Sequence, residues 1–218
     1  MRGFMAVAVL LGMTSFARAD AEVVLRCGDV IDGISQWALG ASSILVRDGR
    51  IAGMAPDLEE SPEAKVIDLS EATCLPGLID THVHPMFEKG DLEKQILNES
   101  SAWKALKGLQ NAQKMLQAGF TTIRIPGDAD RLFAPVDLKR AVEGGLVRGP
   151  RIFVSAHALS STGGHGDLGF LAPEIALRGP AVADGVEEIR RMVRREIKFG
   201  SDWIKIMATG GFLSAHDD

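Results

Sequence analysis

The sequence predicts an α/β protein in which parallel β–α units follow a shorter β-rich segment. From Pro76 onward, apolar runs of strand length alternate with longer segments of helical periodicity. The preceding segment, from Glu22 to about Cys74, shows only short strands separated by turns. Alternation of strands with helices of this length indicates a parallel sheet. Four such strands fit either half of an eight-stranded barrel or an open doubly wound sheet.

The β-rich segment contains short apolar runs bounded by turn residues. Asp48-Gly49 lies between two of these runs, and this dipeptide is a strong signal for a tight hairpin. A further turn is expected at residues 30–33. The predicted strands are residues 23–25, 43–46, 51–54 and 65–69. We assign residues 20–74 to one domain, which is too small to hold much core alone.

The following segment, residues 75–218, is predicted to hold four β–α units. Its first helix stops at Gly119, and the third stops at Gly200. The first helix is expected to bury an apolar stripe at Ala102, Ala105, Leu106, Leu109, Ala112, Met115 and Leu116. The predicted strands are residues 77–82, 120–125, 151–156 and 203–207, and the predicted helices are 101–118, 136–147 and 185–199. No G-x-G-x-x-G motif follows the first strand, so the phosphate loop of a dinucleotide-binding sheet is absent.

Composition excludes one class of partner. The 218 residues are 46% hydrophobic and 24% charged, with a net charge of −5, as in ordinary soluble proteins. Nucleic-acid binding needs a basic stripe, and none is present. The arginine cluster at residues 190–195 is interleaved with glutamates, which is typical of a solvated helix face.

The first 19 residues resemble a secretory signal. Arg2 precedes an apolar run, and Ala17-Arg18-Ala19 places small residues where a signal peptidase cleaves, so we expect cleavage before Asp20. A buried N-terminal helix or a membrane anchor is the alternative, but spanning a bilayer takes about 20 apolar residues. The expected location is therefore periplasmic or secreted, with no membrane span. Cys27 and Cys74 could pair in an oxidising compartment, but two cysteines do not make a disulfide framework. Both lie in apolar stretches, and we favour two buried thiols.

Two histidines are the first candidates for chemistry. His82 and His84 lie two residues apart at the end of the first strand after Pro76, so their imidazoles share one face while Val83 points away. Barrel active sites lie at this end of the strands. We therefore interpret the pair as metal ligands. A structural pair is the alternative.

Lys205 lies mid-strand between apolar neighbours. Burial favours the neutral amine, which can act as a nucleophile or add carbon dioxide. The resulting carbamate has two oxygens, suited to bridge two cations. Alternatively, the amine reaches the strand end and pairs with an acid such as Asp217. Spacing alone does not decide between these readings.

Glycine-rich segments follow the third and fourth strands. Thr162-Gly163-Gly164-His165-Gly166-Asp167 places His165 over the same strand ends, where it could contact a substrate carbonyl or carboxylate. Thr209-Gly210-Gly211 is interpreted in the same way, so Gly164 and Thr209 join His165 as predicted substrate contacts. An exposed glycine-rich turn is the alternative. His157 is expected to have a packing role, and His216 is left unassigned.

Five motifs in order resemble the metal-dependent amidohydrolase superfamily, in its imidazolonepropionase-like and prolidase-like (Xaa-Pro dipeptidase-type) branch. The resemblance covers essentially the whole chain after residue 19. The motifs are VRDGRI at 46–51, PGLIDTHVH at 76–84, AGFTTIR at 118–124, TGGHGD at 162–167 and KIMATGG at 205–211. One departure is Ile125 after Arg124, where relatives often carry an acid, which leaves the role of Asp128 open.

The resemblance implies a (β/α)8 TIM barrel with a β-sandwich built from both chain ends. It implies that His82 and His84 bind one divalent metal, in these enzymes often zinc, and that a carboxylated Lys205 bridges it to a second. His165 and Lys205 would then be catalytic. Two further histidines and an aspartate would lie beyond Asp218. This chain would hold the first four β–α units, a fragment that is inactive by itself.

The implied reaction is hydrolysis of a small amide by metal-activated hydroxide. Dipeptides, N-acyl amino acids and cyclic amides are the expected substrates, and homo-oligomerisation is left open. Two alternatives remain. The chain could be a non-catalytic, metal-binding half-barrel, whose open sheet edges favour association. It could also belong to a mononuclear, deaminase-like enzyme in which Lys205 is not carboxylated.

Overall fold

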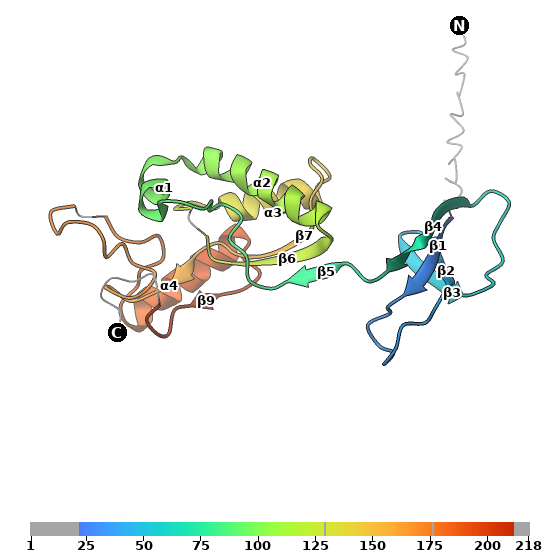
Figure 1. The fold of residues 1–218 in the computed structure, drawn as a ribbon. Coiled ribbons are helices and arrows are strands. Elements are labelled where there is room, and N and C mark those ends of the chain that lie inside the picture. The colour runs from blue at the N-terminus through green and yellow to red at the C-terminus, as the bar shows by residue number, and fades with distance from the viewer. Residues whose placement is uncertain (1–21, 129, 176, 212–218) are drawn as a thin grey trace, which may run out of the picture. The chain divides into compact units, whose positions relative to one another are not determined.

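A computed structural model describes residues 22–128, 130–175 and 177–211, and it divides the chain into two compact units (Figure 1). Unit 1 is Met1–Pro76 and unit 2 is Gly77–Asp218. The predicted signal segment, its cleavage site and His216 lie outside the described residues. Within the described ranges, no helix has the length and apolar character needed to cross a bilayer.

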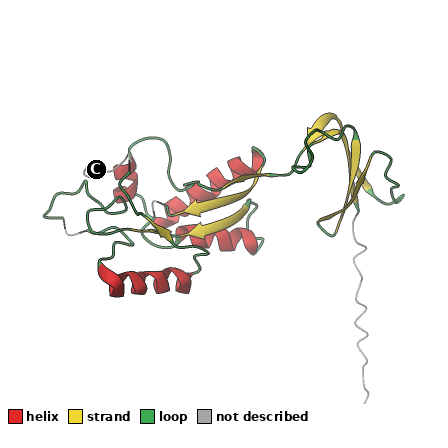
Figure 2. Cartoon of the chain, turned by 90° about the horizontal axis from the view of Figure 1, so that it is seen from below, coloured by secondary structure: helices red, strands yellow, loops and turns green. Residues whose placement is uncertain are grey.

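Unit 1 is a four-stranded sheet in the order β3-β2-β1-β4 (Figure 2). Its strands are β1 (Val23–Val30), β2 (Ser42–Arg47), β3 (Arg50–Ala55) and β4 (Lys65–Cys74). The hairpin predicted at Asp48-Gly49 is present, because Arg47 pairs with Arg50 and both turn residues have positive φ angles, 53° and 70°. Strand β1 pairs with β2 antiparallel and with β4 parallel.

The expectation of two free thiols is wrong. Cys27 and Cys74 form a disulfide with their Cα atoms 5.8 Å apart. The sequence places them 47 residues apart, but the parallel pairing of β1 with β4 brings Cys74 opposite Val30, close to Cys27. Pairing depends on this register, which the apolar character of the two stretches does not reveal.

Unit 2 is built on parallel strands that follow chain order. Strands β5, β6 and β7 form one sheet, and β8 pairs in parallel with β9. These strands are β5 (Leu78–Asp80), β6 (Phe120–Pro126), β7 (Arg151–Ser155), β8 (Ala158–Leu159) and β9 (Lys205–Ile206). Strand β8 was not predicted, and β9 is shorter than the predicted residues 203–207.

Four helices connect these strands: α1 (Leu92–Asn98), α2 (Ser101–Gln117), α3 (Ala134–Glu143) and α4 (Gly185–Phe199). Helices α2 and α3 pack together and against β6 and β7 (Figure 1). Helix α1 was not predicted. Helix α3 starts two residues before the predicted 136, with Pro135 in its first turn, and ends before Gly144.

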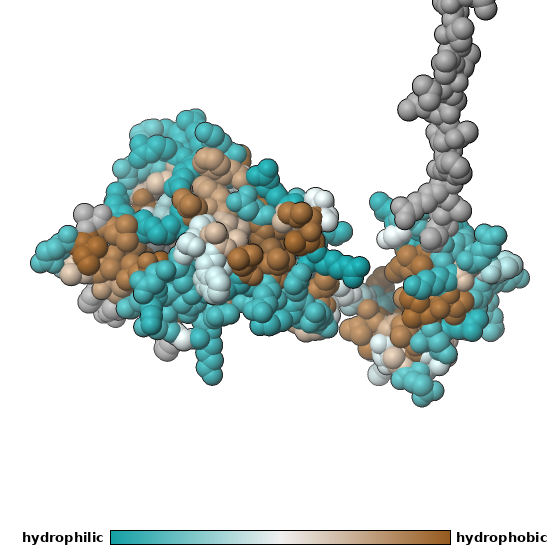
Figure 3. All heavy atoms as spheres, turned by 90° about the horizontal axis from the view of Figure 1, so that it is seen from above, coloured by the Kyte–Doolittle hydropathy of each residue, from teal (hydrophilic) through white to brown (hydrophobic). Residues whose placement is uncertain are grey.

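The core of unit 2 lies between the sheet and helices α2 and α3. Ile123, Ile125, Ile152 and Val154 from β6 and β7 are at most 2% exposed. Each contributes about 1.5–3 kcal/mol by burial. Other strand residues keep apolar side chains at the surface, including Leu78, Ile79 and Ile206, as does Trp203 just before β9. Apolar areas are visible on the surface of this unit (Figure 3).

The predicted apolar stripe of α2 is partly wrong. Ala105, Leu109, Ala112 and Met115 do pack against the core, but Leu106 is 62% exposed. Lys104 and Lys107 are buried instead. Lys107 forms an ion pair with Glu99 at 2.6 Å. A charged side chain that has such a partner can be buried on a helix face that the apolar pattern assigns to solvent.

Candidate active site

A cavity of about 790 Å³ lies where the strands of unit 2 end. Its wall includes residues that follow β5 and β6, the loop after β8, and β9 with the segment after it. The predicted site residues on this wall are His82, His84, His165, Lys205 and Thr209. Segments up to 127 positions apart in sequence (209 minus 82) therefore meet in one cavity, as expected for parallel strands whose carboxyl ends share an edge.

His82 and His84 face the cavity together because the chain keeps an extended alternation. The backbone N–H of Val83 donates to the Arg124 carbonyl at 3.0 Å, and the Val83 side chain is buried. The two imidazole centroids are 5.2 Å apart, with the rings inclined at 68°. Asp80 accepts the His82 N–H at 3.0 Å and fixes the turn out of β5. This geometry agrees with the predicted common face.

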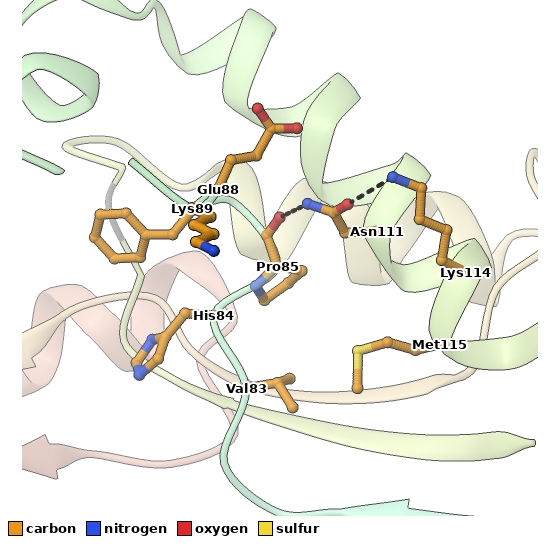
Figure 4. A pocket seen from close by; sticks show the side chains of 9 residues that line it. Val83, His84, Pro85, Glu88, Lys89, Asn111, Lys114 and Met115 are labelled. Carbon is orange, nitrogen blue, oxygen red and sulfur yellow. Dashed lines mark hydrogen bonds between the residues drawn. The ribbon is translucent and has the colours of Figure 1, made fainter. Parts of the chain in front are cut away.

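The His84 ring is held in one orientation. Its Nδ1 lies 2.7 Å from the Gly127 carbonyl oxygen, which can only accept, so Nδ1 carries the proton and Nε2 keeps a free lone pair. Metal-binding histidines commonly have this second hydrogen bond, which fixes the tautomer. His84 lines the cavity. The following segment is anchored where Asn111 Nδ2 donates to the Pro85 carbonyl at 2.9 Å, beside a second pocket that His84 also lines (Figure 4).

The electrostatics around His84 favour the neutral imidazole. Desolvation of the partly buried imidazole lowers the pKa of His84, and the nearby charges of His82 and Lys205 lower this pKa further. The bond to the Gly127 carbonyl acts in the opposite direction but does not reverse the shift. Since a metal needs the unprotonated nitrogen, this environment suits ligation.

Lys205 reaches the same cavity from β9. Its backbone N–H donates to Ser155 Oγ at 3.2 Å, which ties β9 to the end of β7. The lysine is half-buried, and its charge is close enough to affect the pKa of His84. The arrangement brings an amine beside the two imidazoles.

His165 is positioned by a hydrogen-bonded loop and by Gly211. Asp167 accepts the N–H groups of Gly163 at 3.0 Å and Gly179 at 3.1 Å, which closes the loop. A Cβ atom at position 211 would lie 2.3 Å from Cε1 of His165, so the ring packs directly on the Gly211 backbone. Thr209 also lines the cavity, but Gly164 does not and packs on Ser160 and Ser161. A substrate contact for Gly164 stays a prediction.

His157 lies apart from this cavity wall and is buried, in agreement with its predicted packing role. Its Nδ1 is 2.7 Å from Glu196 Oε1, which also shows that Glu196 does not belong to a solvated helix face. Arg190 and Arg191 do form exposed ion pairs with Glu187 and Glu188, as predicted for that face.

Three charged cavity residues that follow β6 have no role assigned from sequence: Asp128, Asp130 and Arg131. Asp128 Oδ2 accepts the Met86 N–H at 3.1 Å and thereby ties the segment after β6 to the segment after the two histidines. Their position directly after strand β6 was the available signal, because the carboxyl ends of neighbouring strands meet there.

The residues present fit part of a metal centre. Two imidazoles on one face suit zinc and similar divalent ions, and His84 is pre-oriented. Among residues 22–128, 130–175 and 177–211, no group of three or more histidine, cysteine, aspartate and glutamate side chains could hold an ion. A complete centre therefore requires further ligands, to which a modified Lys205 could contribute.

Comparison with known proteins agrees with this geometry. A profile of the amidohydrolase family matches residues 73–217. Ochratoxinase from Aspergillus niger is 32% identical over 162 residues, which are 66% of this chain and 32% of that protein. A Xaa-Pro dipeptidase with bound methionine superposes with a TM-score of 0.80 at 30% identity, covering 89% of this chain and 48% of that one. A prolidase complexed with N-methylphosphonate-L-proline superposes with a TM-score of 0.77 at 36% identity, covering 91% of this chain and 49% of that one. This chain therefore spans about half the length of these solved structures.

Proposed function

The chain belongs to the amidohydrolase family, and we propose that the complete protein hydrolyses small amides at a divalent-metal centre that includes His82, His84 and Lys205. One observation carries the proposal. These three side chains come from two separate strand ends and line one cavity with His165. Polar side chains gathered in one cavity are expected for a catalytic centre, whereas packing alone does not explain why they lie there.

His82 and His84 would hold an ion through ring nitrogens, and the bond from His84 Nδ1 to Gly127 keeps Nε2 available. Divalent ions bound there would polarise the scissile carbonyl and lower the pKa of a water molecule. The neutral form of His84, favoured by its surroundings, is the form that ligation needs.

Lys205 would act as a carboxylated ligand. Its neutral Nζ forms a bond to the carbon of carbon dioxide and loses one proton, which leaves a carbamate anion with two oxygens. Its position beside the two imidazoles supports this role, because an anion there offsets the charge of two cations.

His165 and Thr209 would position the substrate. His165 rests on the Gly211 backbone, and His165 and Thr209 line the cavity together with apolar side chains of α1. Dipeptides, including those with C-terminal proline, N-acyl amino acids and cyclic amides are the substrates we propose. The likeness to a Xaa-Pro dipeptidase and to a prolidase supports the first of these.

We further propose that residues 75–218 form the first four β–α units of a (β/α)8 barrel and residues 20–74 part of a β-sandwich. Parallel strands in chain order support the first assignment. The exposed apolar side chains of Leu78, Ile79 and Ile206 support it as well, since strands of a closed barrel are covered on both faces.

Export to the periplasm or the medium is proposed from the signal-like residues 1–19. The disulfide between Cys27 and Cys74 supports it, because such bonds persist in oxidising compartments and are rare in the cytosol.

The test of the metal centre is Lys205→Ala in the complete protein. The matched control is Lys198→Ala, because Lys198 is an exposed lysine of α4. We expect Lys205→Ala to lose one of two metals per chain and most dipeptide hydrolysis while keeping its circular dichroism spectrum. Short carboxylic acids should restore part of the activity by bridging in place of the carbamate. Lys198→Ala should resemble the wild type.

Three results would contradict parts of this proposal. Two metals and full activity in Lys205→Ala would make the lysine a paired structural side chain. One metal in the wild-type protein would indicate a mononuclear centre without the carbamate. A complete wild-type protein that binds metal but hydrolyses no amide would favour a non-catalytic metal-binding role.

A further inference from the structure

Arg131 presents an unused guanidinium donor at the cavity. The residue lies between β6 and α3 and lines the same cavity as His82, His84 and Lys205. Its Nη1 atom is buried and has no hydrogen-bond partner among the described residues. An arginine cannot escape this situation by losing its proton, because it stays charged at any physiological pH. A buried charged donor without an acceptor is costly, so an absent acceptor is implied.

The backbone that carries Arg131 is held by its neighbour. Asp130 is 2% exposed, and its Oδ2 accepts Ser101 Oγ at 2.9 Å, the Leu132 N–H at 2.9 Å and the Ala134 N–H at 3.0 Å. These bonds join the segment to both α2 and α3. The backbone of Arg131, which lines the cavity, is therefore held in place, so less conformational entropy is lost when a ligand binds.

Three of the four acids that line the cavity accept hydrogen bonds from other groups. Asp130 accepts hydrogen bonds from Ser101, Leu132 and Ala134. Asp128 accepts the Met86 N–H, and Asp167 accepts two backbone N–H groups of its own loop. Glu93 also lines the cavity, from α1. The described residues include no ion pair between any of these carboxylates and Arg131.

The rest of the wall indicates the kind of acceptor. Phe87, Leu92, Ile96, Leu168 and Phe170 give the cavity an apolar side, and its volume of about 790 Å³ suits a small molecule. The planar guanidinium fork matches the two oxygens of a carboxylate. A molecule with an apolar side chain and a carboxylate therefore complements the cavity better than a neutral amide does.

We propose that Arg131 binds the carboxylate of the substrate and so selects N-acyl amino acids and dipeptides over neutral cyclic amides. This inference rests on the proposed amide hydrolysis, whose proposed residues His82, His84 and Lys205 line the same cavity. It makes Arg131 a specificity-determining residue of this chain.

Equilibrium binding tests the proposal without relying on turnover. The complete protein is titrated in a calorimeter with 4-phenylbutyrate and with the neutral 4-phenylbutan-1-ol, neither of which contains an amide. Each titration is done with metal bound and after removal of metal by a chelator. The variants are Arg131→Met and, as control, Arg140→Met, because Arg140 has a side chain 75% exposed on α3 and lies outside the cavity wall.

We expect metal-free wild-type protein to bind the acid roughly 10- to 100-fold more tightly than the alcohol, as for a charge-assisted hydrogen-bond pair. Arg131→Met should lose most of this preference, while Arg140→Met should keep it. Arg131→Lys keeps the charge but not the planar fork, so it should retain only part of the preference for the acid. This variant replaces Arg131→Met in the test if the methionine variant does not fold.

Two results would overturn the proposal, and a third would refute only the proposed function. A metal-free wild type without preference for the acid would do so directly. An undiminished preference in Arg131→Met would assign the carboxylate to His165, Lys205 or the metal. A wild type that prefers the acid but hydrolyses no amide would instead refute the proposed function and leave the role of Arg131 in place.

Discussion

At the scale of single residues, Gly211 controls the position of His165. Any side chain at position 211 would place its Cβ 2.3–2.6 Å from three atoms of the His165 ring. The imidazole would have to move away from the place where it lines the cavity. Among the glycines whose surroundings the structure describes, Gly211 alone meets this ring, so a methyl group at position 211 would displace it.

We therefore predict that Gly211→Ala in the complete protein lowers kcat/KM for amide hydrolysis by about 10- to 100-fold, as expected for a group displaced by about 1 Å. Metal content should be unchanged, since His82 and His84 are untouched. Gly169→Ala is the control, because a Cβ there meets no atom within 4 Å. Steady-state kinetics with elemental analysis measures both effects. Equal activity of the two variants would show that His165 has no part in the reaction.

Residue patterns reveal some of these groups and hide others. The spacing of His82 and His84 is sufficient to predict a shared face, because side chains alternate along any extended segment. Arg131 shows no such signal, since a lone arginine in a polar segment resembles a solvated one. Only the fold shows that its Nη1 is buried in the cavity wall.

At the scale of elements, α4 is joined to the end of β7 by a buried polar cluster. Glu196 accepts from His157 Nδ1 at 2.7 Å and from Ser201 Oγ at 2.7 Å, and Ser201 Oγ in turn accepts the Ala156 N–H at 3.0 Å. The side chains of His157 and Glu196 are 0% and 2% exposed. This cluster holds the segment that leads to β8 and the loop of His165.

We predict that Glu196→Gln lowers the free energy of unfolding by about 1–3 kcal/mol at pH 7. Burial raises the pKa of Glu196, but the hydrogen bonds and charge of His157 and the bond from Ser201 outweigh it, and the net pKa lies below its ordinary 4.5. The stabilisation is therefore present above about pH 4.5 and is lost as pH falls through the lower folded-state pKa.

Denaturant unfolding followed by circular dichroism, at pH 7 and at several values below 4.5, measures this effect. The wild-type advantage should shrink towards acid pH. The control is Glu187→Gln, whose exposed side chain (82%) should change stability by no more than about 0.5 kcal/mol. A difference between wild type and Glu196→Gln that stays constant with pH would mean that the charge of Glu196 adds nothing.

Element predictions succeeded where local signals are strong. Helix α4 has the predicted bounds because Gly200 adopts a left-handed conformation, φ 103°, that ends it. The β2–β3 hairpin follows from its turn residues. Helix α1 and strand β8 were missed, since segments of seven and two residues carry little periodicity and depend on tertiary contacts.

At the scale of the whole molecule, the mixed α/β fold agrees with the sequence prediction and with the solved amidohydrolases. Parallel order could be predicted because strands alternate with helices. The disulfide could not, since the contact between Cys27 and Cys74 depends on how β1 and β4 pair across 47 residues. Long-range register is decided by the packed sheet and not by either strand.

The disulfide also bears on where the protein works. Closing a loop of this length lowers the entropy of the unfolded chain, and the loop-entropy relation gives about 4 kcal/mol. Unit 1 contains a small core cluster, in which Cys27, Val30 and Ile44 are the buried residues. The disulfide is therefore expected to contribute a large share of the stability of unit 1. In a compartment that keeps thiols reduced, the bond would not form and this stabilisation would be lost.

The final prediction follows from export. Protein recovered from the periplasm or medium should begin at Asp20 by mass spectrometry and contain no free thiol at Cys27 or Cys74. Replacing both cysteines, Cys27→Ser with Cys74→Ser, should lower the stability of the exported protein by about 2–4 kcal/mol. Reducing agent should destabilise the wild type by a similar amount and leave the double variant unchanged, which separates loss of the bond from a packing defect. Intact Met1 on cytosolic protein with two free thiols would contradict export, because both the signal and the oxidising environment would then be missing.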